Sequence, residues 1–273
     1  MSAAPRTPVV LLHALSLHAS MWQAQVRALR ERGHRVLAVD QRGFGTAPLA
    51  LGEAPPPPSL DVVAEDLART LDSQGVGRAV LAGSSMGGYA AMAFLRRFPD
   101  RVAGLALLSA RATADDPAAA AQRLRFAELV LDPAHRPVIV EQVTPLLLGD
   151  TTRARRPELL ARVLADARAA DPAALAWAQR AIAARQDSTE VLRAARVPAL
   201  VIAGEQDALV AAQESRRLAE LLPQGRLLTL PQAGHLQPLE APEEVTRALA
   251  GLLDEVDEVG RSVAPVGSGA RAC

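Results

Sequence analysis

Residues 79–88 read AVLAGSSMGG, an apolar run that leads directly into the pattern Gly-x-Ser-x-Gly at 83–87. The next residues, YAAMAFLRRF at 89–98, favour a helix that ends before Pro99. A chain that leaves a strand and enters a helix within one or two residues must turn sharply, and small residues allow this turn without a Cβ clash. The stretch therefore predicts a strand, a tight turn and a helix, with the Ser85 hydroxyl projecting above a sheet.

The same turn predicts part of an anion-binding site. The backbone N–H of Met86 falls at the start of the predicted helix, where donors are unpaired and the helix dipole favours negative charge. Ser85 would then be a nucleophile and Met86 one donor to an oxyanion. The alternative is a Gly/Ser turn in an ordinary βα unit, and residues further along the chain decide between the two.

Short apolar runs alternate with helical patterns along most of the chain, which predicts βαβ units. We expect an α/β fold with a mostly parallel sheet of about six strands, flanked by helices and joined by right-handed crossovers. The predicted strands are 9–12, 36–39, 79–82, 105–108, 199–203 and 227–230. The predicted helices between them are 18–31, 60–74, 87–98, 211–222 and 242–256.

Residues 112–195 interrupt this alternation with helical patterns and no convincing strand. An all-helical insertion between two parallel strands predicts a lid over the carboxyl ends of the strands, where α/β proteins bind ligands. The expected division is a core domain of residues 8–111 and 196–256, the lid at 112–195, and a disordered tail at 257–273. Within the lid, the predicted helices are 118–131, 137–148, 157–170 and 172–185.

A nucleophilic serine needs a base and an orienting acid. His235 lies in the loop between the last apolar run and the last helix, and Asp207 follows the run 199–203. Loops at one edge of a parallel sheet can bring both side chains over Ser85. Taken singly, His235 could be a surface residue and Asp207 a solvated loop acid, with Glu205 as a competing acid. Three such residues on successive strand ends favour a catalytic set.

The loop after the first predicted strand reads HALSLH at residues 13–18. We expect the Leu15 N–H in this loop to be the second oxyanion donor, paired with the N–H of Met86. Such donors typically supply a few kcal/mol of transition-state stabilisation.

Composition excludes several classes of function. The 273 residues are 49% hydrophobic with a formal net charge of +0, which gives no reason to expect nucleic acid or a membrane as a partner. The chain has no Lys and no Asn, so a lysine base and an asparagine oxyanion donor are absent. Its one cysteine, Cys273, allows no intrachain disulfide. With no signal peptide or membrane-spanning stretch, we expect a cytoplasmic protein without metal or organic cofactor.

Taken together, the chain resembles the α/β-hydrolase superfamily, in particular lidded carboxylesterases and 3-oxoadipate enol-lactonase-like hydrolases. The resemblance covers residues 8–256 and includes the serial order Ser, Asp, His. It rests on His13-Ala14, Trp22, DQRGFG at 40–45, GSSMGG at 83–88, GEQD at 204–207, GHL at 234–236, Glu240 and Pro242. Thr113-Ala114-Asp115 and Arg185-Gln186-Asp187 suggest the enol-lactonase branch.

The resemblance also implies roles for residues outside the catalytic set. Asp40 and Arg42 would brace neighbouring loops, and His13 would order the oxyanion loop rather than transfer protons. Two departures stand out. Ala14 replaces the usual glycine beside the oxyanion loop, and the family's N-terminal antiparallel hairpin is missing or reduced.

The predicted function is serine-dependent hydrolysis of a carboxylic ester or lactone of small to medium size through an acyl-enzyme. Thioester hydrolysis, C–C bond hydrolysis and cofactor-free perhydrolysis use the same residues. A non-catalytic ligand sensor on this fold is the alternative from another class of function.

The sequence also offers candidate substrate-binding residues. Arg185 could meet a substrate carboxylate or be solvated. The apolar lid residues could line the pocket or pack the lid core: Phe126, Leu146, Leu147 and Trp177.

Overall fold

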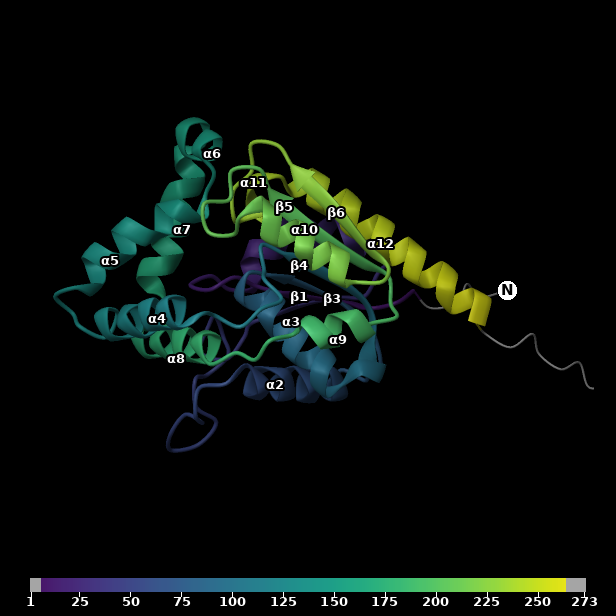
Figure 1. Cartoon of the computed structure of the whole chain (residues 1–273), viewed down its shortest axis with the longest axis horizontal. Coiled ribbons are helices and arrows are strands. Elements are labelled where there is room, and N and C mark those ends of the chain that lie inside the picture. The colour runs from purple at the N-terminus through teal and green to yellow at the C-terminus, as the bar shows by residue number, and fades with distance from the viewer. Residues whose placement is uncertain (1–5, 264–273) are drawn as a thin grey trace, which may run out of the picture.

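The computed structural model describes residues 6–263, which fold around one six-stranded sheet (Figure 1). All neighbouring strands are parallel, in the order β2-β1-β3-β4-β5-β6, so the predicted α/β fold is confirmed. No antiparallel pair occurs in this part of the chain. The strands are β1 (Val9–Leu12), β2 (Val36–Val39), β3 (Ala79–Ser84), β4 (Val102–Leu108), β5 (Ala199–Gly204) and β6 (Gly225–Leu230).

Alternate residues of the central strands pack on opposite faces of the sheet, as strand geometry requires. Val10 and Leu12 join a core with α2 (Leu60–Ser73) and α3 (Met86–Arg97). Val9 and Leu11 join a second core with η1 (Ala19–Trp22), α1 (Gln23–Glu31), α11 (Gln237–Glu240) and α12 (Pro242–Val263). Helix α10 (Ala212–Leu221) packs beside β5 and β6.

The last helix is longer than predicted, so residues 257–263 of the expected tail are helical. Leu252, Leu253 and Val256 continue the buried stripe of α12. The carboxylate of Asp257 accepts a hydrogen bond from the Thr7 N–H at 2.9 Å, which ties the helix to the start of β1. The remainder of the expected tail, 264–273, lies outside the described residues.

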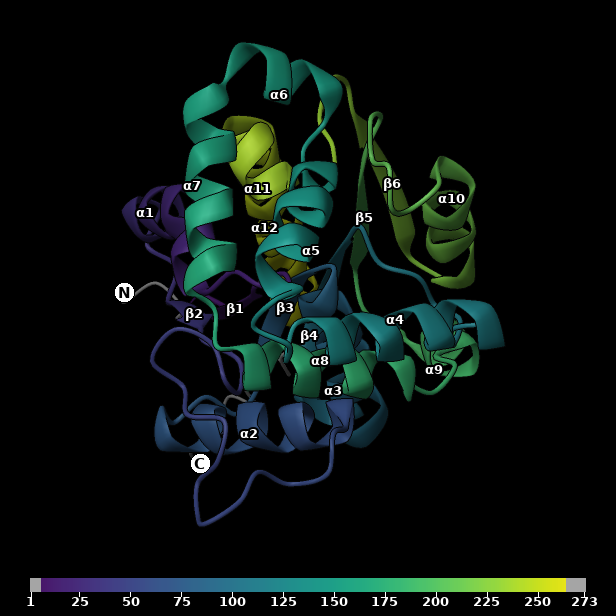
Figure 2. The same cartoon turned by 90° about the vertical axis from the view of Figure 1, so that its left-hand side faces the viewer.

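Helices fill the chain between β4 and β5 (Figure 2). They are α4 (Pro117–Leu129), α5 (Arg136–Val143), η3 (Thr144–Leu147), α6 (Asp150–Arg155), α7 (Pro157–Ala169), α8 (Pro172–Ala183) and α9 (Thr189–Ala194). The side chains of Asp116 and Asp171 cap α4 and α8, each followed by a proline at the first helical position. Helices α4–α8 stand at one end of the sheet, whereas α9 contacts α3 of the core.

Candidate active site

Ser85 occupies a strained corner between β3 and α3. Its backbone has φ 52° and ψ −112°, a conformation that residues other than glycine rarely adopt. Glycine is required on both sides of the corner because the backbones approach closely. A Cβ at Gly83 would lie 2.2 Å from the Gly87 carbonyl oxygen, and one at Gly87 would lie 2.2 Å from the Leu12 oxygen. The Gly-x-Ser-x-Gly spacing thus follows from the geometry of the turn.

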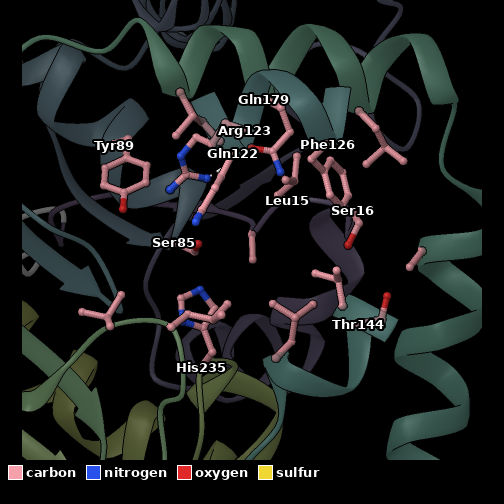
Figure 3. Close-up of a pocket in the computed structure, with 18 of the residues that line it drawn as sticks. Leu15, Ser16, Ser85, Tyr89, Gln122, Arg123, Phe126, Thr144, Gln179 and His235 are labelled. Atoms are coloured by element: carbon pink, nitrogen blue, oxygen red, sulfur yellow. Dashed lines mark hydrogen bonds between the residues drawn. The ribbon is translucent and has the colours of Figure 1, made fainter. Parts of the chain in front are cut away.

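His235 and Asp207 meet on loops at the same edge of the sheet. Nδ1 of His235 lies 3.0 and 2.9 Å from the two carboxylate oxygens of Asp207, and both side chains are almost fully buried. The competing acid, Glu205, is exposed and accepts instead from the backbone of Gln232. Since Nδ1 is held by Asp207, Nε2 is the ring nitrogen left to act on Ser85. Figure 3 shows Ser85 and His235 facing one cavity.

Asp207 remains ionised despite its burial. Burial alone would raise its pKa, but the hydrogen bond and charge of His235 hold the pKa of this carboxyl below its ordinary value. The hydroxyl of Ser109 donates to Oδ2 at 2.7 Å, and the N–H groups of Leu209 and Val210 donate to Oδ1 at 2.8 and 3.0 Å. The carboxylate is therefore fixed in charge and in orientation.

The two predicted oxyanion donors have no acceptor within residues 6–263, and of the two residues only Leu15 lines the cavity. Neither the Leu15 N–H nor the Met86 N–H donates to another described residue. The loop that carries Leu15 is held in a strained conformation, with φ 65° at Ser16. Leu15, Ser16 and Ser85 all line the cavity.

His13 holds this loop as the resemblance implied. Its Nδ1 donates to the Ala14 carbonyl at 2.8 Å, and the Gln41 N–H donates to its Nε2 at 2.9 Å. These partners fix one neutral tautomer. Burial lowers the pKa of His13 to about 4, so the ring stays uncharged at neutral pH. His13 therefore orders the loop and has no free nitrogen for proton transfer.

Asp40 and Arg42 brace loops, which confirms their expected structural role. Asp40 accepts hydrogen bonds from the backbone of Ala19 and Thr46, 21 and 6 residues away. Arg42 binds both carboxylate oxygens of Asp66 at 2.7 Å. Neither side chain reaches the cavity of Ser85.

The cavity over Ser85 has a volume of about 350 Å³, within the usual range for small-molecule sites. Phe126 and Leu147 line it, as the sequence suggested. Two other expectations are corrected. Leu146 points outward with 40% of its surface exposed. Trp177 is buried outside the cavity lining, and its Nε1 donates to the Pro56 carbonyl at 2.7 Å.

Arg185 takes neither of its two expected roles, since it is buried and does not line the cavity of Ser85. Its guanidinium pairs with Asp115 at 2.7 Å, donates to the Thr113 carbonyl at 2.9 Å, and lies 4.4 Å from the ring centroid of Tyr89. The triplet Thr113-Ala114-Asp115 and Arg185 thus form a structural junction between the core and the lid.

Three residues that support the site were not singled out for it from sequence. Ser109 and Gln237 extend the hydrogen bonds of Asp207, because Gln237 Nε2 donates to the Ser109 hydroxyl at 2.6 Å. Glu240, noted only as part of a motif, accepts from the N–H groups of Gly149 and Gly234 at 2.8 and 2.9 Å. Spacing could have pointed to Glu240, five residues after His235, but nothing in the sequence marks Ser109.

The comparisons with known proteins agree with this fold. A family model described as alpha/beta hydrolase fold matches residues 7–242. The chain belongs to this family. An esterase from Thermogutta terrifontis is 38% identical with a TM-score of 0.85, covering 92% of this chain and 90% of that one. The enol-lactonase from Burkholderia xenovorans LB400 is 28% identical with a TM-score of 0.81, covering 92% of each chain.

A relative in Variovorax paradoxus carries the name Putative carbamate hydrolase RutD. It is 33% identical over 254 residues, which cover 92% of this chain and 93% of the relative. This α/β-hydrolase is therefore similar over nearly its full length to proteins named for hydrolysis of several carbonyl compounds.

Two further properties concern residues 6–263 only. None of their helices combines the length and apolar character needed to cross a bilayer. Their His, Cys, Asp and Glu side chains form no group of three or more with the geometry of a metal site.

Proposed function

We propose that this α/β-hydrolase cleaves a carboxylic ester or lactone with Ser85 as nucleophile, His235 as base and Asp207 as orienting acid. One observation carries the proposal. His235 is held by Asp207 through Nδ1 and shares a cavity with a serine at a strained strand–helix corner. This arrangement supplies a nucleophile and an activating base in one pocket.

The proposed reaction begins when Ser85 Oγ attacks the carbonyl carbon and His235 Nε2 takes the hydroxyl proton. The oxyanion accepts hydrogen bonds from the Leu15 and Met86 N–H groups. His235 then gives its proton to the leaving alkoxide, and the acyl group remains on Ser85. A water molecule, deprotonated by His235, attacks this acyl-enzyme and releases the acid. Asp207 stabilises the imidazolium in both steps.

Similarity to proteins named esterase and enol-lactonase supports an ester or lactone as the bond cleaved. The same groups would attack a carbamate, a thioester or an activated C–C bond, or pass an acyl group to peroxide. A panel of acyl esters, lactones and carbamates therefore decides the bond type, with the rate per substrate as the measurement.

The Ser85→Ala variant tests the chemistry. We expect hydrolysis of 4-nitrophenyl acetate and butyrate to fall by at least about a thousandfold, because the acyl-enzyme can no longer form. Ser84→Ala is the matched control, since Ser84 is the adjacent residue and its buried hydroxyl has no hydrogen-bond partner in the described structure. Full activity in Ser85→Ala would refute the proposal. Saturable ester binding without turnover or fluorophosphonate labelling in the wild type would favour a sensor.

A further inference from the structure

The cavity over Ser85 has an uneven distribution of charge. Its described lining contains two guanidinium groups, Arg111 and Arg123, and no Asp or Glu. Apolar side chains dominate the remainder, notably Phe126, Leu147 and Leu175. A buried pocket with excess positive charge favours a ligand that carries negative charge, because low-dielectric walls strengthen the attraction.

Arg123 shares a buried carboxylate, Asp115, with Arg185. Its Nε lies 2.5 Å from Oδ2 of Asp115, and Nη2 of Arg185 lies 2.7 Å from Oδ1 of the same carboxylate. Burial would raise the pKa of Asp115, but the hydrogen bonds and charges of Arg185 and Arg123 hold it below its ordinary value. Asp115 therefore divides its charge between the two arginines, and Asp187 places a second negative charge near Arg185.

Of these two arginines, only Arg123 lines the cavity. The Arg185 side chain is only 4% exposed and is occupied by Asp115, two backbone carbonyls and the face of Tyr89. The Arg123 side chain is 25% exposed and lines the cavity. Besides Asp115, its only hydrogen-bond partner within residues 6–263 is the Gln179 side-chain oxygen, at 3.2 Å. Some of its five N–H donors therefore remain for a ligand.

Two glutamines stand beside this guanidinium. Gln122 comes from α4 and Gln179 from α8, and Figure 3 shows both next to Arg123 on the side of the cavity that lies across Ser85 from His235. A guanidinium flanked by amide donors matches the planar, bidentate geometry of a carboxylate. The lining contributed by α5, η3 and α7 is apolar apart from Thr144.

We propose that Arg123, with Gln122 and Gln179, binds a carboxylate on the substrate, remote from the bond that Ser85 attacks. The substrate class is thus a monoanionic ester or lactone whose apolar chain separates the two groups. This inference rests on the proposed hydrolase function. In the competing view, Arg123 serves only to neutralise Asp115 and touches no substrate.

Two esters of equal chain length separate these views. Monomethyl adipate ends in a carboxylate where methyl hexanoate ends in a methyl group, and methanol release measures the hydrolysis of both. We expect the wild type to favour monomethyl adipate by tenfold or more in kcat/KM. Arg123→Gln should reduce this preference about tenfold or more, mainly by raising KM, because one charge-assisted contact is lost. Arg123→Lys should recover part of it.

Arg125→Gln is the matched control. Arg125 lies on the same helix, is exposed, and does not line the cavity, so its loss changes the net charge equally without touching the site. We expect an unchanged preference in this variant. Equal losses on both esters in Arg123→Gln, a wild-type preference for methyl hexanoate, or the same effect in Arg125→Gln would overturn the proposal.

Binding affinity measured by calorimetry tests the carboxylate site without any hydrolysis of the ester. Monomethyl adipate should bind to Ser85→Ala, and the further change Arg123→Gln should weaken that binding about tenfold. If the wild type cleaves neither these esters nor any ester, lactone or carbamate of the panel, the hydrolase proposal fails while calorimetry still decides the carboxylate site. Should Arg123→Gln unfold, Gln179→Leu replaces it, and equal binding of the two esters to Ser85→Ala would again refute the site.

Discussion

Asp207 depends on Ser109, a residue that never touches the cavity. Ser109 directly follows β4 and has φ 49°. This strained backbone aims its hydroxyl at the Asp207 carboxylate, and Gln237 Nε2 donates a hydrogen bond to the same hydroxyl. We expect Ser109→Ala to lower kcat about tenfold, in line with the loss of one hydrogen bond to a charged group. The pKa of Asp207 should rise toward its ordinary value, so activity should be lost at a higher pH on acidification. A pH–rate profile measures both effects.

Ser84→Ala serves again as the comparison for Ser109→Ala, since it also deletes a buried serine hydroxyl. Ser84 Oγ has no partner in the described structure, so this variant should keep its activity and its pH profile. A Ser109→Ala enzyme with an unmoved profile would show that the hydroxyl only fills space.

The sequence predicted the positions of some residues of the site and not of others. The geometry of Ser85, Asp207 and His235 could be anticipated because each follows a strand of one parallel sheet, whose carboxyl ends meet. Trp177 and Leu146 could not be placed, because the face that a lid helix turns toward the cavity depends on packing between helices. The Trp177 partner is a proline carbonyl 121 residues away.

At the scale of elements, the segment 147–151 is joined to both loops that carry the candidate acid and base. The Leu147 carbonyl accepts from the His235 N–H at 3.2 Å, and Glu240 bridges Gly149 to Gly234. On the other side, the Thr151 N–H donates to the Gln206 side chain at 2.9 Å, one residue before Asp207. The position of His235 relative to Asp207 thus depends on this part of the lid.

Glu240→Ala tests this dependence. Three backbone N–H groups, including that of Leu236, lose their charged acceptor, so we expect kcat/KM to fall about tenfold or more. Hydrogen exchange at residues 147–151 and 234–236 should accelerate. Glu243→Ala, an exposed change in the first turn of α12, should alter neither quantity. Faster exchange with full activity would mean that the bridge stabilises the lid without positioning His235.

At the scale of the whole molecule, the six parallel strands and the helical character of the chain between β4 and β5 could be predicted from periodicity, whereas the spatial order of the strands was not predicted. Buried parallel strands are short apolar runs, and long amphipathic helices repeat every 3.6 residues. Helices α6 and α9 were missed because six residues span less than two turns and show no clear period. The extent of α12 was missed because its anchor, the bond from Thr7 to Asp257, joins residues 250 positions apart.

The stability of the folded chain should fall on mild acidification because His13 is buried as a neutral ring. Its pKa is lowered from 6.5 to about 4 in the fold, chiefly by burial. Between these values the unfolded chain binds a proton that the folded chain does not, so the free energy of unfolding decreases as pH falls from 6.5 to 4. The loss attributable to His13 is roughly 3 kcal/mol, at 1.36 kcal/mol per pKa unit. Below that window the folded form also protonates, and this contribution becomes constant.

Urea unfolding measured across the window should give a flatter dependence of the unfolding free energy on pH for His13→Gln than for the wild type. The remaining slope is due partly to His34, whose pKa is likewise lowered by burial. His135→Gln changes an exposed ring paired with the exposed Asp132, and should alter the slope far less than His13→Gln does. An identical slope in His13→Gln and wild type would mean that His13 is not what couples the fold to pH.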